Sequence, residues 1–324
     1  MNTLPPLPLV DGAFQIDNSS LVHFQTCRRM YELSDIRRYS LSASRAGRNF
    51  GSCLHVGWKE RYTMCGPYTP NIAQTSRIND AMRVYMETNP PPTDDFRDYA
   101  HAEKMMAAYT NHWGNEPFKL LSLPDGSLFV EKSFAFELGT VQNTPIIYTG
   151  RIDLGLENND GLWNLDHKTT FQYGTAFDDE MAIDGGQIGY VWATRKMLGV
   201  HTNGYIINAV RVRRPSKAGK YIENGTPGAP IDASDFKRMP FYVDSATVDE
   251  WRTDVLNLIT DLFFNHDRGF YPKSRKACVG KYGRCDFYEC CNAPIERRQS
   301  ILDSSLFVTN EWSPLNATKK EQDV

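Results

Sequence analysis

Residues 162–170, LWNLDHKTT, place an acid and a base two positions apart at the end of an apolar run that favours a β-strand. Alternate residues of a strand share one face, so Asp166 and Lys168 should point the same way and His167 the opposite way. A second acid, Asp153, lies in GRIDL of the preceding strand. A hairpin joining the two strands can bring Asp153 beside Asp166.

Paired carboxylates of this kind repel one another unless a cation lies between them. Their oxygen atoms suit Mg²⁺ or Mn²⁺, which keep bound water and bind phosphate oxygens. A lysine beside such an ion can position a water molecule or help to deprotonate it, and can stabilise charge that grows on a phosphate. The residues therefore indicate metal-dependent phosphoester hydrolysis, although DHK alone is more often an ordinary Asp–Lys pair at a strand end.

The periodicity of the surrounding sequence predicts the elements that position these residues. The first third of the chain is expected to be helical, with helices in residues 17–39, 47–64, 75–88 and 96–113. Strands are expected in residues 127–138, 145–158, 161–170, 203–214 and 238–244, and further helices in 184–199 and 245–266. This order indicates an α/β fold with a mixed sheet flanked by helices.

Composition places the 324-residue chain among ordinary globular proteins, with 41% hydrophobic and 23% charged residues. No apolar run reaches the ~18 residues of a membrane span, and the N-terminus lacks the pattern of a secretory signal, so we expect a cytoplasmic protein. The net charge of −3 does not exclude a nuclease, because acidic surface can offset a basic groove. Basic runs at 211–217 and 273–276 could contact phosphate, although most such runs are merely solvated.

The seven cysteines are Cys27, Cys53, Cys65, Cys278, Cys285, Cys290 and Cys291. Their clustering near the C-terminus favours a metal site over disulfides in a reducing compartment. Four thiolates can hold structural Zn²⁺ or an iron–sulfur cluster, and spacing alone favours zinc. Unliganded thiols are the third possibility. Cys53 and Cys65 lack partners at a useful spacing and are expected to be structural.

The chain resembles the PD-(D/E)XK nuclease superfamily, in the RecB-like branch that includes AddB-type and CRISPR-adaptation exonucleases. The resemblance covers roughly residues 20–292 and rests on motifs in family order: GSCLHVGW with His55, GRID with Asp153, DHKT with Asp166 and Lys168, and GGQIGYVWA with Gln187 and Tyr190. Two residues separate Gln187 from Tyr190 where many relatives have three, a difference that helical geometry tolerates. The resemblance implies a restriction-endonuclease-like sheet with an N-terminal helical elaboration.

By this resemblance Asp153 and Asp166 are metal ligands, with the backbone carbonyl of His167 as a third. Lys168 is the catalytic lysine, and His55 completes or supports the metal site. On its own, His55 would more often be a helix histidine packed near the core.

Three further positions match the family pattern. Glu131 corresponds to a strand glutamate of less certain role. Gln187 and Tyr190 lie three apart and thus on one helical face, which in the family adjoins the active site and helps to hold it or the DNA. The same helix is also expected to pack its apolar side on the sheet.

The resemblance extends to relatives that carry a [4Fe–4S] cluster on one N-terminal and three C-terminal cysteines. The ligands it implies are Cys27, Cys278, Cys285 and Cys291, with structural zinc as the alternative. Cys290 adjoins Cys291, so which of the two ligates is open. The cluster-binding segment would span residues 271–302.

The expected organisation is a single nuclease domain over residues 18–302, with a helical part at 18–122 and a catalytic core at 123–270. The Pro-rich residues 1–17 are expected to form a flexible arm, and residues 303–324 a polar tail. A Walker-type nucleotide-binding motif is absent from the sequence, so we expect no ATP hydrolysis.

The function expected from these motifs is a Mg²⁺- or Mn²⁺-dependent exonuclease acting on single-stranded or end-containing DNA, in recombination, repair or viral DNA processing. A recombination or replication protein is a possible partner. A non-catalytic DNA-binding or assembly protein and a different metal-dependent phosphoesterase are the alternatives. Digestion polarity, exonucleolytic or endonucleolytic mode, preference for DNA over RNA, and oligomeric state stay open at this point.

Overall fold

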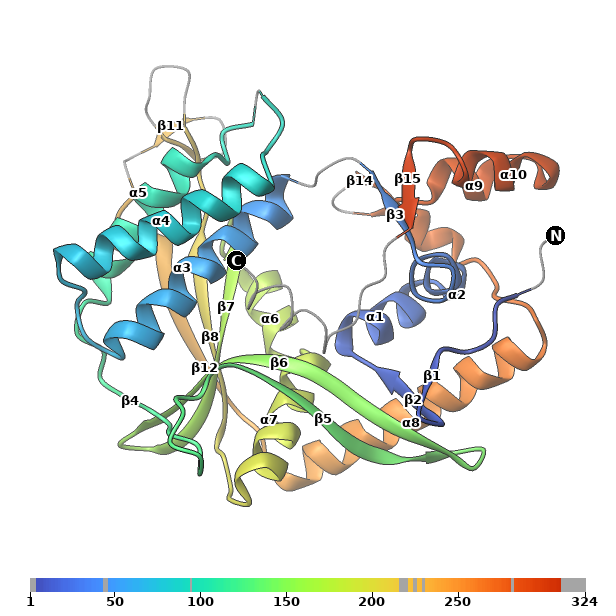
Figure 1. The fold of residues 1–324 in the computed structure, drawn as a ribbon, viewed down its shortest axis with the longest axis horizontal. Coiled ribbons are helices and arrows are strands. Elements are labelled where there is room, and N and C mark those ends of the chain that lie inside the picture. The colour runs from blue at the N-terminus through green and yellow to red at the C-terminus, as the bar shows by residue number, and fades with distance from the viewer. Residues whose placement is uncertain are drawn as a thin grey trace. The chain divides into compact units, whose positions relative to one another are not determined.

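The computed structural model of the chain (Figure 1) describes residues 4–42, 46–93, 95–215, 221–223, 226–228, 231–280 and 283–309. The chain forms two compact units, each assembled from segments that are far apart in the sequence. The first unit comprises Met1–Ala43, Ser133–Arg151 and Val248–Val324, and the second comprises Ser44–Lys132 and Ile152–Thr247. This division differs from the three consecutive parts that the sequence predicts.

Helices cover both faces of the sheet in the second unit. The strands of this sheet are β4 (Lys119–Leu120), the second half of β6 (Thr144–Asn158), β7 (Gly161–Thr170), β8 (Gly204–Arg211) and β12 (Phe236–Tyr242). The helices are α3 (Ala46–Cys65), α4 (Ile72–Thr88), α5 (Tyr99–His112), α6 (Thr175–Ala182) and α7 (Gly185–Leu198). Short elements complete the unit: β9 (Arg214–Pro215), β10 (Tyr221–Glu223), β11 (Thr226–Gly228) and a 3₁₀ turn at Ala233–Asp235.

The two faces of β7 are covered by different helices because its side chains alternate. Trp163 and Leu165 belong to one buried core with Trp58 of α3 and with apolar residues of α4 and α5. On the other face, Asn164 accepts a hydrogen bond of 2.8 Å from the hydroxyl of Thr194 on α7. Asp166 and Lys168 therefore belong to the α7 face of the strand.

The sheet is mixed, as the sequence predicts. β6 and β7 form an antiparallel hairpin, β7 and β8 pair in parallel, and β12 is antiparallel to β8. The parallel connection between β7 and β8 contains α6 and α7, as expected for a crossover that lies against the sheet. The predicted mixed α/β class, with helices flanking the sheet, is confirmed.

Local sequence signals determine where α7 begins and ends. Asp184 caps its N-terminus by accepting hydrogen bonds from the backbone amides of Gly186 and Gln187. Gly199 ends it in the left-handed conformation, with φ of +68°. These limits agree with the helix predicted over residues 184–199.

The first unit combines short strands with helices of both chain ends. Its strands are β1 (Leu9–Val10), β2 (Ala13–Ile16), β3 (Tyr39–Leu41), most of β5 (Val130–Val141), the first half of β6, β13 (Val279–Gly280), β14 (Gly283–Arg284) and β15 (Phe307–Thr309). Its helices are α1 (Asn18–Thr26), α2 (Arg28–Tyr31), a π-helical turn (Glu32–Ile36), α8 (Ser245–Asp267), a 3₁₀ turn (Arg275–Cys278), α9 (Tyr288–Asn292) and α10 (Ile295–Leu302).

The expected flexible arm over residues 1–17 is wrong for its second half. β2 pairs in parallel with β6, and its Phe14 and Ile16 side chains are buried. Phe14 packs edge-on against Phe263 of α8, with 5.2 Å between ring centroids. Proline-rich composition predicted a loose segment, whereas the alternation of buried side chains in AFQI makes it a strand.

Two other expectations need correction in this unit. The helix expected in residues 17–39 begins after its cap residue Asp17 but is interrupted at Cys27, whose backbone is extended. The predicted polar tail contains β15, which pairs with β3 and buries Phe307; residues 310–324 lie outside the described part of the chain.

No helix among the described residues is both long enough and apolar enough to span a membrane.

Candidate active site

The candidate site begins where backbone pairing between β6 and β7 ends. In this hairpin Asn158 pairs with Gly161 beside the turn, and Leu154 pairs with Leu165 at the other end of the paired region. At the next position the Asp153 carboxylate accepts a 2.8 Å hydrogen bond from the backbone amide of His167. A side chain thus replaces the backbone partner at this point, and the buried carboxyl groups of Asp153 and Asp166 adjoin one another.

A histidine and two acids converge beside this opening. His55 on α3, Glu131 near the start of β5 and Asp153 on β6 offer ligand atoms that all lie within 4.8 Å of one another. The Nδ1 atom of His55 is 3.5 Å from an Asp153 oxygen and 3.8 Å from a Glu131 oxygen. One nitrogen and several carboxylate oxygens suit a divalent cation such as Mn²⁺ or Mg²⁺.

Glu131 reaches this group from an unusual backbone conformation. Its φ is +49°, a left-handed value that costs energy for a residue with a side chain. Strain of this kind persists where the surrounding structure over-determines it, and is common at functional sites. The sequence pointed to Glu131 only through a family strand position, whereas the structure brings its carboxylate beside His55.

The surroundings of this group favour the protonated forms of His55 and Asp153. Burial lowers the pKa of His55, but the carboxylates of Asp153, Glu131 and Asp166 outweigh burial and raise the pKa to about 9. Burial is the main cause that raises the pKa of Asp153 to about 7, and the charges of Asp166 and Glu131 add to it. A cation in this group would compete with these protons.

Asp166 and Lys168 form an ion pair on the face of β7 opposite to the His167 ring. The ammonium of Lys168 lies 2.8 Å from Asp166 Oδ2. Burial opposes the charge on Lys168, yet Asp166, Asp184 and Asp153 together raise its pKa above the usual range. The lysine is therefore a permanent cation here, suited to orient or stabilise an anion rather than to accept a proton.

Asp166 is not part of the tight group of His55, Glu131 and Asp153. Its predicted role as a metal ligand therefore stays a prediction. Its charge acts on His55 of that group, and its carboxylate pairs with Lys168.

The His167 side chain points away from these acids, as strand alternation predicts. Its ring stacks on Trp58 with 4.1 Å between centroids, and burial holds its pKa well below the usual range. The amide and carbonyl of one strand residue lie on the same side of the strand. The predicted carbonyl ligand thus belongs to the side of β7 where the His167 amide meets Asp153.

The two predicted residues of α7 differ in exposure. Gln187 is 2% exposed, and its Oε1 atom has no hydrogen-bond partner within the described residues. Tyr190, one turn further along, is half-buried. Asp184, which the sequence indicated only as the start of a helix, also belongs to the surroundings of the site, because its charge acts on Lys168.

The sequence of this chain matches the model of the PD-(D/E)XK nuclease superfamily over residues 18–292. The chain belongs to the PD-(D/E)XK nuclease superfamily. The match covers all the predicted metal-site and catalytic residues. Nucleases of this superfamily use divalent metals, and the mixed sheet flanked by helices agrees with their restriction-endonuclease-like fold.

Two solved structures are similar to this chain at low sequence identity. A candidate exonuclease from Eubacterium rectale is 12% identical, with a TM-score of 0.47, over 89% of this chain and 92% of that one. A protein designated SSO0001 is 11% identical, with a TM-score of 0.28, over 75% of this chain and 80% of that one. No curated protein sequence matches this chain. The family assignment rests on the sequence match.

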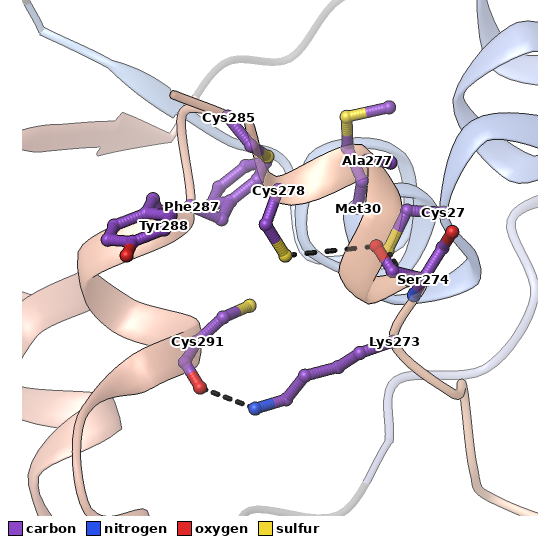
Figure 2. A pocket seen from close by; sticks show the side chains of 10 residues that line it. All are labelled: Cys27, Met30, Lys273, Ser274, Ala277, Cys278, Cys285, Phe287, Tyr288 and Cys291. Carbon is purple, nitrogen blue, oxygen red and sulfur yellow. Dashed lines mark hydrogen bonds between the residues drawn. The ribbon is translucent and has the colours of Figure 1, made fainter. Parts of the chain in front are cut away.

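A second candidate site lies within the first unit, where four cysteines line one cavity (Figure 2). Cys27 lies between α1 and α2, and Cys278 ends a 3₁₀ turn. Cys285 precedes α9, and Cys291 lies within it. The remaining lining residues are Met30, Lys273, Ser274, Ala277, Phe287 and Tyr288. None of these four cysteines forms a disulfide in the described part of the chain.

The structure separates Cys291 from its neighbour Cys290. Cys291 lines the cavity, whereas Cys290 is buried in a hydrophobic cluster that also contains Leu33 and Phe307. The Cys290 thiol donates to the backbone carbonyl of Arg298 at 3.8 Å. Cys53 is buried in the core of the second unit, where burial raises its pKa to about 12.

Two arginines of the basic run at 211–217 are paired with an acid. Arg211 and Arg213 both donate to the buried carboxylate of Asp235, and Arg214 is exposed. Residues 216–217 lie outside the described part of the chain. In the run at 273–276, Lys273 donates to the backbone carbonyl of Cys291, and Arg275 and Lys276 are exposed.

Proposed function

We propose that this chain is a Mg²⁺- or Mn²⁺-dependent deoxyribonuclease of the RecB-like branch that digests single-stranded or end-containing DNA as an exonuclease. The observation that carries the proposal is the group of His55, Glu131 and Asp153 beside the Asp166–Lys168 pair. Recombination, repair or viral DNA processing is the proposed setting, with a partner protein from the same process.

The donor set fits a divalent cation. His55, Glu131 and Asp153 would hold it, with Asp166 and the His167 carbonyl as further oxygen donors. The bound cation would polarise the scissile phosphate and lower the pKa of a bound water molecule. The elevated pKa values of His55 and Asp153 indicate that this buried group already requires positive charge.

The chain's own groups divide the remaining tasks. Asp166 holds the Lys168 ammonium at 2.8 Å, which limits the positions the lysine can take. The charged lysine can orient the attacking water and stabilise negative charge on the phosphate as the bond from phosphorus to the leaving oxygen breaks. The buried Gln187 amide, with its oxygen unpartnered within the described chain, is available to hold a ligand of the site.

An exposed aromatic residue supports unpaired DNA as the substrate. Phe171 follows β7 three positions after Lys168, is 55% exposed, and has the guanidinium of Arg97 at 5.7 Å from its ring centroid. Thr170 and Tyr173 anchor the turn on either side through hydrogen bonds to the backbone. Aromatic faces of this kind stack with unpaired bases.

We further propose a [4Fe–4S] cluster on Cys27, Cys278, Cys285 and Cys291. These four thiols line one cavity, and the residues that form it come from both ends of the sequence. Four thiolates also suit a single structural zinc ion, so the metal content of the purified protein decides between the two.

The test is to purify the protein without oxygen, record its absorption spectrum, and incubate it with end-labelled single-stranded DNA, double-stranded DNA and RNA. Wild type and Asp166→Ala are compared with Mg²⁺, with Mn²⁺ and with chelator. We expect metal-dependent degradation of single-stranded DNA that the variant lacks. A protein that binds DNA yet degrades no substrate would favour the assembly-protein alternative, and cleavage of other phosphoesters alone would favour a different hydrolase.

A further inference from the structure

Two arginines and a glutamate are buried together in the second unit, away from the acids described above. Arg61 on α3 and Glu116 after α5 have fully buried side chains, with 3.0 Å between Nη1 and Oε1. Arg238 on β12 contacts the other carboxylate oxygen of Glu116 at 2.5 Å. Buried charges are costly unless each is paired and hydrogen-bonded, so a cluster of this kind has few alternative arrangements.

Hydrogen bonds connect this cluster to Asn208 on β8. The Tyr62 hydroxyl donates to Glu116 at 2.6 Å and lies 2.9 Å from the Tyr109 hydroxyl. Asn208 Nδ2 donates to the Tyr109 hydroxyl at 2.9 Å, and Arg238 Nε donates to Asn208 Oδ1 at 3.2 Å.

These partners determine how the Asn208 amide is oriented. A guanidinium can only donate, so the amide oxygen must face Arg238. The amide nitrogen therefore faces His167, whose Nδ1 lies 2.6 Å away and must accept. The ring is held on its other side by the stacking contact with Trp58.

His167 transmits this constraint to the metal-site group through its own peptide. Its side chain is bonded to Asn208, and its backbone amide donates to Asp153 at 2.8 Å. A rotation of the His167 residue would thus move the hydrogen bond that orients the Asp153 carboxylate. The network spans α3, β7, β8 and β12, whose relative positions the shared core already stabilises.

We propose that Asn208, itself held by Arg238, is a positioning residue that fixes the His167 peptide and, through it, the Asp153 carboxylate for the cation. This inference rests on the proposed metal site. Outer partners of metal ligands typically contribute ten- to a hundredfold to metal affinity. The hydrogen bonds of Asn208 go to His167, Tyr109 and Arg238, so its effect should appear in cation binding before any effect on DNA binding.

The test is Mn²⁺ binding to the DNA-free protein by titration calorimetry, with thermal unfolding followed in parallel. Asn208→Leu keeps the branching and the number of heavy atoms of the side chain but removes its hydrogen-bonding groups, and we expect the Mn²⁺ dissociation constant to rise about tenfold. Thr194→Val is the matched control, since it removes a buried hydrogen bond to Asn164 in the same unit that does not involve His167. The control should bind Mn²⁺ within twofold of wild type.

A double variant tests the route through His167. His167→Phe keeps a ring against Trp58 and removes the acceptor, so it should weaken Mn²⁺ binding to a similar extent. If Asn208 acts through His167, the double variant should lose no more affinity than either single variant. Asn208→Ser, which is too short to reach His167, carries the same expectation should the leucine variant unfold.

Each outcome separates this inference from the proposed function. Wild-type protein that binds no Mn²⁺ would overturn the metal site and the inference together. Wild type that binds, with Asn208 variants that lose thermal stability but keep full affinity, would overturn only the positioning role. Additive losses in the double variant would show that Asn208 acts by another route.

Discussion

At the scale of single residues, the candidate site separates two kinds of positive charge. Asp166 and neighbouring acids raise the pKa of Lys168, so the lysine keeps its proton. His55 has a pKa of about 9 and is protonated only below that pH. We propose that the permanently charged lysine pairs with the substrate phosphate and that the histidine exchanges its proton for the cation.

Replacing Lys168 by Met should reduce DNA cleavage at least about a hundredfold while Mn²⁺ binding persists, since the cationic group that stabilises charge on the phosphate is lost. Lys237→Met is the matched control, because Lys237 forms a similar ion pair with Asp178 and both lysine side chains are 37% exposed. Cleavage of end-labelled DNA under single-turnover conditions measures the effect. Equal losses in both variants would argue against a specific role of Lys168.

The pKa values of His55 and Asp153 predict pH-dependent cation binding. Between about pH 7 and pH 9 Asp153 becomes ionised while His55 is still protonated, so binding should displace one proton. The affinity for Mn²⁺ should then rise about tenfold per pH unit in this window and more steeply below pH 7, where Asp153 also gives up a proton.

Calorimetric titrations in buffers of different ionisation enthalpy would count the released protons directly. In His55→Gln one proton fewer should be released, because that variant has no imidazole to deprotonate and only Asp153 still titrates. Affinity that is independent of pH in wild type would contradict the prediction.

At the scale of elements, the turn that follows β7 joins the catalytic strand to an exposed aromatic residue. Phe171→Ala should weaken binding of single-stranded DNA by about 1–3 kcal/mol, the usual contribution of one stacked base, and should affect blunt duplex DNA less. Fluorescence anisotropy with labelled oligonucleotides, in chelator to prevent cleavage, measures this.

Tyr242→Ala is the control for this prediction. Tyr242 is 72% exposed in the same unit, yet the strand register aligns it with Gly204 and Trp163, at the start of β7 rather than its end. Equal losses in both variants would indicate general surface effects instead of stacking at Phe171.

The break between α1 and α2 determines where Cys27 lies. Cys27 adopts an extended backbone between two helices, and its sulfur accepts a 3.3 Å hydrogen bond from the amide of Ser274. A continuous helix would place Cys27 differently, so the break is part of what brings this thiol to the cavity.

At the scale of the whole molecule, the four-cysteine cavity joins residues from both ends of the sequence. Cys27→Ser should abolish the visible absorption of the anaerobically purified protein and lower its unfolding temperature, since a ligated cluster cross-links segments that are far apart in the sequence. Cys290→Ser, outside the cavity, should retain the absorption.

Absorption spectra, iron content and circular-dichroism melting curves test this together. Loss of colour in Cys290→Ser and not in Cys291→Ser would exchange the two assignments. Zinc in place of iron in the wild-type protein would overturn the cluster and leave a metal site on the same thiols.

The sequence by itself determined the features that depend on neighbours along the chain. The strand over residues 161–170, the cap and end of α7, and the opposite faces of His167 and Lys168 all follow from local periodicity and from capping side chains. The order of the motifs was sufficient to predict the family.

Only the tertiary structure decided features that depend on contacts between distant segments. β2 lies in the sheet because Phe14 and Ile16 find buried partners, which composition cannot reveal. The approach of Glu131 to His55, and the hydrogen bonds that connect Asn208 to Asp153 through His167, join residues on separate elements. Packing brings these groups together, and no spacing along the chain encodes such contacts.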